Sequence, residues 1–83
     1  MKKLVEIMFY SKDGKLDHAH ILSTKMIKGL AGIKRIDELE DDCYAQAQLD
    51  ASIVDAVKSN SMDVDHIVIF NDYAGTAEKY SIR

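Results

Sequence analysis

Three histidines are the residues of this sequence that could most readily bind a metal ion. His18 and His20 lie two positions apart, whereas His66 lies far along the chain, beside Asp65. On a β-strand, residues two apart point to the same side, so His18 and His20 could share a metal ion. On a helix they lie about 160–200° apart and could not. Because a helix is favoured for this segment below, we expect His18 to be solvated and His20 to edge a buried stripe.

The single cysteine and a run of acidic residues are the other candidates for chemistry. Cys43 falls in an expected strand among small apolar residues, which predicts a buried, unactivated thiol. A lone cysteine excludes an internal disulfide and every multi-cysteine metal motif. The acidic residues of 38–42 lack the glycine and the spacing of a calcium loop, so a solvated hairpin tip is expected.

No phosphate-binding glycine loop, nucleophile elbow or zinc-protease pattern occurs in the sequence. We therefore predict a protein that is not an enzyme, with no catalytic residue and no cofactor. Metal or small-ligand binding through His18, His20, His66 or the acidic turn 38–42 stays open as an alternative.

The composition is that of one small, acidic, folded domain spanning 1–83. Of the 83 residues, 47% are hydrophobic and 30% are charged, with a net charge of −3. This balance is typical of globular rather than disordered chains. A chain without a clustered basic surface is not expected to bind nucleic acid through its phosphates. The apolar N-terminal run is too short and interrupted for a signal peptide or membrane span, so we expect a cytoplasmic protein and no membrane partner.

Two segments are predicted to be central strands. Residues 3–10 alternate two largely apolar faces, and residues 65–71 form a continuous apolar run. Between them, residues 15–23 admit two interpretations: a strand after the Asp13-Gly14 turn, or the start of a helix over 16–30. The helix is favoured, because its apolar stripe is sustained for four turns and glycines follow it.

The middle of the chain predicts a hairpin followed by a helix. Alternation over 33–39 and 42–49 indicates two strands joined by the acidic turn. In the second strand, small apolar residues would face the core, and the opposite face would carry Tyr44, Gln46 and Gln48. Asp50 would then cap a helix over 51–59. The tail, 72–83, fits either a short edge strand or a packed extension.

Strand, helix, strand, strand, helix, strand is the ferredoxin-like βαββαβ order, an α+β fold with both helices on one face of an antiparallel sheet. The segment GLAGIKRI at 29–36, with the acidic turn, the Cys43 strand and the helix 51–59, resembles the heavy-metal-associated, metallochaperone-like domains over 3–70. The family's metal loop, with two cysteines two apart, is absent, and residues 11–15 stand there instead. The resemblance therefore implies the fold and not the family's copper or zinc handling.

The sheet face left uncovered by the helices is the predicted route to function. It would carry Met8, Tyr10, Tyr44, Gln46, Gln48, His66, Val68 and Phe70. So apolar an exposed surface normally marks an interaction site, whereas RNA stacking is not expected in so acidic a chain. Either the tail covers this face through Tyr80 and Ile82, or a second copy binds it as a homodimer, or another protein does. We predict a non-enzymatic interaction module acting on a protein partner or on its own copy.

Overall fold

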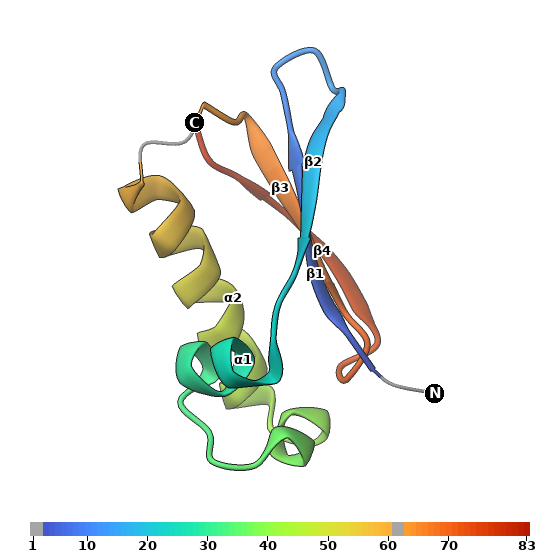
Figure 1. The fold of residues 1–83 in the computed structure, drawn as a ribbon, viewed down its shortest axis with the longest axis vertical. Helices are drawn as coiled ribbons and strands as arrows, with labels where there is room; N and C mark the ends of the chain where they lie inside the picture. Colours follow the sequence, from blue (N-terminus) through green and yellow to red (C-terminus); the bar gives the residue numbers. More distant parts are fainter. Residues whose placement is uncertain (1–2, 61–62) are drawn as a thin grey trace.

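Two β-hairpins, one from each end of the chain, form the sheet of this protein (Figure 1). The computed structural model describes residues 3–60 and 63–83. The strands are β1 (Val5–Tyr10), β2 (Leu16–Ile21), β3 (His66–Asn71) and β4 (Thr76–Ser81). Their spatial order is β2-β1-β3-β4, and each neighbouring pair is antiparallel. The strands predicted at 3–10 and 65–71 are therefore the central pair, as expected.

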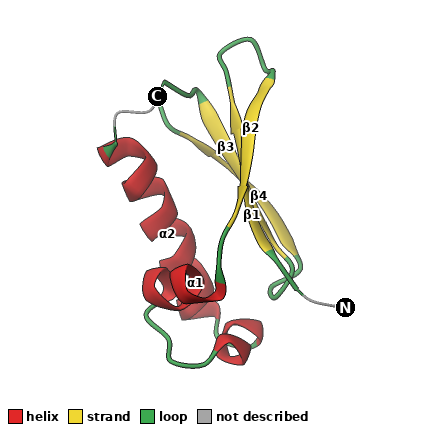
Figure 2. Ribbon diagram, in the orientation of Figure 1, coloured by secondary structure: helices red, strands yellow, loops and turns green. Residues whose placement is uncertain are grey.

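In the described part of the connection between the two hairpins there are three helices: α1 (Thr24–Ala31), the short 3-10 helix η1 (Ile36–Glu40) and α2 (Cys43–Ser59). They lie on one side of the sheet (Figure 2). The α+β class with a four-stranded antiparallel sheet is thus confirmed, but the observed order is strand, strand, three helices, strand, strand. Within the described ranges, no helix combines the length and the apolar character needed to cross a membrane.

The segment predicted as one helix over 16–30 is divided between β2 and α1. A tight turn makes β2 fold back on β1: the Ser11 N–H donates to the Lys15 carbonyl at 2.9 Å, and Gly14 has a φ of +80°. Ser23 then begins α1, because its hydroxyl accepts a hydrogen bond from the Met26 N–H at 3.2 Å. The strand interpretation of 15–23 was therefore the correct one.

The hairpin predicted over 33–49 is absent, and its second strand is the first half of α2. Asp42, rather than Asp50, caps this helix, since its carboxylate accepts a hydrogen bond from the Ala45 N–H at 3.1 Å. The buried residues of α2 recur every four positions, which is helical spacing; they are Ala45, Leu49, Ile53 and Val57. Cys43 begins the helix and is exposed, so the prediction of a buried thiol was wrong.

The hydrophobic core lies between the sheet and the helices. Alternate residues of the central strands face it: Val5, Ile7, Phe9, Ile67 and Ile69. The tail forms β4 in the plane of the sheet, so it is an edge strand and does not cross the open side (Figure 2). Tyr80 turns to the helix side, where its hydroxyl donates to the Asp50 carboxylate at 2.6 Å and its ring packs on the core.

Candidate functional site

The open face, defined as the side of the sheet away from the helices, is largely apolar. The register brings Tyr10 beside His66 and Met8 beside Val68 on the two central strands. The remaining open-face positions follow from the same pairings and are Glu6, Leu16, Ala19, Ile21, Phe70, Ala77, Lys79 and Ser81. The structure thus places five predicted residues on one surface: Met8, Tyr10, His66, Val68 and Phe70.

Contacts within the open face hold the rings of Tyr10 and His66 in place. The rings of Tyr10 and His66 stack, with centroids 4.9 Å apart and an interplanar angle of 5°. The Tyr10 hydroxyl lies 3.8 Å from the Met8 sulfur, and His66 Nδ1 lies 2.9 Å from the Asp65 carboxylate. At Tyr10 and His66 a partner would therefore meet ordered side chains, with little conformational entropy left to lose.

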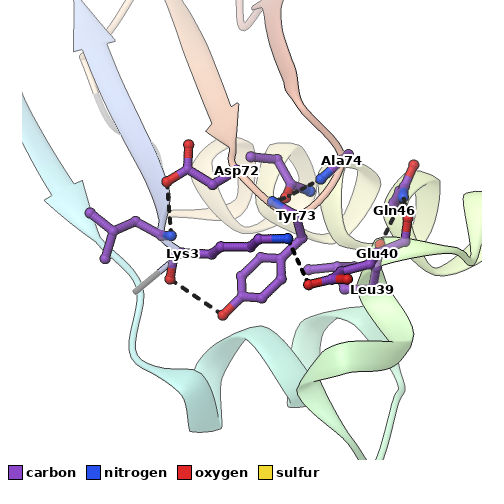
Figure 3. A network of polar contacts seen from close by, with 9 residues as sticks. Lys3, Leu39, Glu40, Gln46, Asp72, Tyr73 and Ala74 are labelled. Carbon is purple, nitrogen blue, oxygen red and sulfur yellow. Dashed lines mark hydrogen bonds and ion pairs between the residues drawn. The ribbon is translucent and has the colours of Figure 1, made fainter. Parts of the chain in front are cut away.

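Three predicted partner-binding residues do not belong to the open face, because the strand that was expected to carry them is helix α2. Tyr44 is 79% exposed on the first turn of α2. Gln46 donates from its amide to the Leu39 carbonyl at 2.7 Å, which ties α2 to η1 (Figure 3). Gln48 donates to the Ser52 hydroxyl at 3.2 Å. Strong helix propensity of the alanines and glutamines over 45–48 is the signal that could have placed them correctly.

Several residues of the acidic run 38–42 make hydrogen bonds or ion pairs within the fold. Glu38 accepts hydrogen bonds from the Lys34 and Arg35 N–H groups, at 3.1 and 2.8 Å. Glu40 pairs with Lys3 at 2.7 Å, joining η1 to the segment that precedes β1 (Figure 3). The hydrogen bond that Lys3 donates to the Glu40 carboxylate raises the pKa of Lys3. With Asp42 capping α2, these carboxylates hold the connection between helices and sheet.

The same corner is closed by the loop between β3 and β4 (Figure 3). The Tyr73 hydroxyl donates to the Lys3 carbonyl at 3.3 Å, and Asp72 accepts a hydrogen bond from the Leu4 N–H at 3.0 Å. The Asn71 side-chain oxygen accepts from the N–H groups of Tyr73 and Ala74 at 3.0 and 3.2 Å. This corner is therefore built for stability, and its polar groups are engaged with one another.

A second candidate surface is a groove of about 370 Å³ between β2 and the helices. It is lined by Phe9, His18, His20, Met26, Ala56, Val57 and Asn60. Because 16–21 is a strand, His18 and His20 share its helix-facing side, contrary to the helical interpretation. The His18 ring stacks on Phe9 with centroids 4.3 Å apart, and its Nδ1 lies 3.0 Å from the Asp17 carboxylate. His66 is on the opposite face of the sheet and cannot join them.

Metal-binding groups do not gather elsewhere in the part of the chain that the structure describes. Across residues 3–60 and 63–83, no cluster of three or more His, Cys, Asp or Glu side chains is placed to hold a metal ion. Within that same part, every buried side-chain nitrogen and oxygen has a hydrogen-bond partner. The open face and the groove are thus the two surfaces from which a function can be argued.

No family model, no curated protein and no solved structure matches this chain. The resemblance to heavy-metal-associated domains stays a prediction, and the hairpin over 33–49 on which it was partly based is absent.

Proposed function

We propose that the protein is a non-enzymatic interaction module that associates with a second copy of itself through the open face. The observation that carries this proposal is an apolar, aromatic surface that no segment of the described chain crosses (Figure 2). Phe70 is 41% exposed and Ile21 52% exposed on this face. Burying such side chains is favourable by about 25 cal/mol per Å² of apolar surface removed from water.

Charge complementarity favours a second copy over an unrelated partner. Glu6 and Lys79 are acidic and basic groups at different positions of the open face, on β1 and β4. Within residues 3–60 and 63–83, neither takes part in an ion pair. In a two-fold dimer the same surface is used by both copies, so Glu6 of one copy can meet Lys79 of the other. Two sheets can pack in this way at a spacing of about 10 Å.

The size of the face predicts weak, reversible association. Four strands of six residues each span roughly 400 Å², from a strand spacing of about 4.8 Å and a rise of about 3.3 Å per residue. A standard stable interface buries about 800 Å² on each partner. We therefore expect a dissociation constant in the micromolar range or weaker, and a dimer that forms only at high concentration.

Sedimentation equilibrium over a concentration series tests the proposal with Val68→Lys and the matched control Tyr44→Asp. Val68 lies at the centre of the open face, whereas Tyr44 lies on α2. The wild type and Tyr44→Asp are expected to dimerise with similar constants, and Val68→Lys is expected to dimerise at least about tenfold more weakly, because it buries an unpaired charge. A wild-type protein that stays monomeric throughout, or a Val68→Lys variant that dimerises normally, would contradict self-association through this face.

Metal binding is a second candidate, favoured by the placement of His18 and His20 on one side of β2 and in one groove. The Asp17 carboxylate near Nδ1 of His18 leaves Nε2 available as a ligand, an arrangement common at metal sites. Two imidazoles suit zinc or copper better than calcium. Thermal unfolding with each ion should show stabilisation by zinc or copper that is lost in His20→Ala and retained in His66→Ala. No shift with any ion would exclude this candidate.

A further inference from the structure

β2 is an edge strand whose main chain has free hydrogen-bonding groups. Among the described residues, its only neighbour in the sheet is β1, and all six of its residues are exposed. The Leu22 N–H donates to the Val5 carbonyl at 3.0 Å, and this bond identifies which residue pairs of β1 and β2 are hydrogen bonded. Because hydrogen-bonded pairs alternate with non-bonded pairs, His18 and His20 turn their N–H and C=O groups towards β1. Ala19 and Ile21 therefore direct theirs outwards, away from the sheet.

The groove lies beside this free edge on the helix side. Its apolar lining comes from three elements: Phe9 from β1, Met26 from α1, and Ala56 and Val57 from α2. A strand added alongside β2 would point every second side chain to the helix side of the sheet, where the groove lies. A ligand that uses both features therefore needs an extended main chain for the free edge and an apolar side chain that points into the groove.

We propose that the protein binds an extended peptide segment as a fifth strand along β2, with one large aliphatic or aromatic side chain of the peptide in the groove. The peptide main chain pairs with the N–H and C=O groups of Ala19 and Ile21, as in other cases of strand addition to a sheet edge. The apolar side chain covers Met26, Ala56 and Val57, and this contact sets the sequence preference. This activity is distinct from self-association, which uses the opposite face of the sheet.

The chemistry of the groove favours such a peptide over a second copy of β2. The residues that β2 of another copy would send to the helix side are His18 and His20. They would meet the same two histidines of the first copy, and neither copy would place an aliphatic side chain over the groove. The apolar lining of the groove would stay unfilled. A peptide with an aliphatic or aromatic residue satisfies both the strand edge and the groove.

β4 supplies a matched control for the edge. The Ile82 N–H donates to the Asp65 carbonyl at 2.9 Å, so by the same alternation Ala77 directs its main chain away from β3. Ala19 and Ala77 are then the same residue type, on the same face, with outward main-chain groups, at opposite edges of the sheet. Ala19→Pro removes an outward N–H without removing a hydrogen bond to β1, and Ala77→Pro does the same at β4.

The groove has its own matched pair on α2. Ala56 lines the groove, and Ala51 is an exposed alanine earlier on the same helix that does not line it. Ala56→Arg places a long charged side chain where the peptide's apolar residue would enter, whereas Ala51→Arg adds the same charge elsewhere.

The experiment selects a phage-displayed library of random nine-residue peptides against the immobilised wild-type protein and measures the affinity of the selected peptides by fluorescence polarisation. We expect selected sequences to share one aliphatic or aromatic position. Their affinity should fall at least about tenfold in Ala19→Pro and in Ala56→Arg, and by less than about twofold in Ala77→Pro and Ala51→Arg. Circular dichroism checks that each variant is folded, and Ala56→Arg carries the test alone if Ala19→Pro fails to fold.

Three outcomes would overturn the proposal. One is a selection that yields no peptide above background. Another is a set of peptides whose binding is unchanged in Ala56→Arg, or lost in Val68→Lys instead, because that would place them away from the groove or on the open face. The third is dimerisation of the wild type that Ala19→Pro abolishes and Val68→Lys leaves intact, which would make a second copy the occupant of this edge. None of these outcomes depends on whether the open face self-associates.

Discussion

The hairpins β1–β2 and β3–β4 are built alike but differ in what their outer strands place on the helix side. β4 places Tyr80 there, and the ring packs on the core while the hydroxyl is held by Asp50. β2 places His18 and His20 there, and both line an open groove. One edge of the sheet is therefore closed over the core and the other is left accessible.

The difference extends to the chemistry of the two edges. β4 carries Glu78 and Lys79 in its middle, and charged residues of this kind discourage an edge strand from pairing with another chain. The middle of β2, from His18 to Ala19, has no side chain with a permanent charge. The outer strand β4 is thus tied directly to α2 through Tyr80 and Asp50, whereas the outer strand β2 is held by its turn and by its pairing with β1.

Substitution of Tyr80 on β4 should destabilise the protein far more than substitution of an inward-facing residue on β2. Tyr80→Ala is expected to lower the free energy of unfolding by about 2 kcal/mol, because it deletes a packed ring and leaves Asp50 without its hydrogen bond. His20→Ala, at an exposed inward position of β2, should change it by less than about 0.5 kcal/mol. Urea denaturation followed by circular dichroism measures both, and equal losses would refute the difference between the edges.

Substitution in the β3–β4 turn should also destabilise the protein more than substitution in the β1–β2 turn. Asn71 is only 2% exposed and satisfies two N–H groups of the β3–β4 loop. Asn71→Ala should therefore cost about 1–2 kcal/mol. The Ser11 hydroxyl accepts one hydrogen bond, from the Lys15 N–H at 3.3 Å, so Ser11→Ala should cost less than about 0.5 kcal/mol. Chemical denaturation of the two variants side by side provides the check, and a larger loss for Ser11→Ala would contradict this comparison.

Alkaline pH should weaken the Tyr80 anchor. Burial and the hydrogen bond to Asp50 raise the pKa of Tyr80 above its ordinary value of 10.0. The folded protein thus keeps a proton that the unfolded chain releases, so this contribution to stability is complete below pH 10 and is lost as the pH rises above it. Tyr80→Phe should be about 1 kcal/mol less stable at neutral pH. Its stability should also decline less steeply above pH 10 than that of the wild type, and parallel curves would argue against this role.

The smallest expected effect concerns the stack in the groove. His18→Ala removes the ring that covers Phe9 and should destabilise the protein by about 0.5 kcal/mol. His20→Ala is the control, because in residues 3–60 and 63–83 no aromatic ring is stacked on it. Thermal unfolding of the two variants should show the lower midpoint for His18→Ala, and identical midpoints would show that the stack contributes nothing.

The central strands and the α+β class could be predicted from the sequence, because apolar residues on both faces leave few alternatives to a buried strand. β2 was missed because its apolar residues and those of α1 together fit one helical stripe, and the burial of each is decided by tertiary packing. The N-cap at Ser23, which separates the two elements, was the local signal that could have divided them.

At the start of α2 the error was the opposite one, because a helix was predicted to be a strand from the alternation of apolar and polar residues. In CYAQAQL, small apolar and polar residues alternate as in a strand, yet Ala45 and Leu49 also lie one helical turn apart. Because this segment is a helix, the open face does not carry Tyr44, Gln46 and Gln48. The open face does carry Met8, Tyr10 and His66, because their strands were predicted correctly. The groove could not be predicted, since it depends on how α2 is placed relative to β2.

The position of β1 and β3 at the centre of the sheet has a consequence for how the chain folds. Each hairpin joins neighbouring segments and can form in microseconds, whereas Tyr10 pairs with His66 only when the whole helical segment is closed as a loop between them. We expect this closure to limit the folding rate. The most buried strands would then be the last to meet, and slow refolding would expose the apolar rows of both hairpins to other chains.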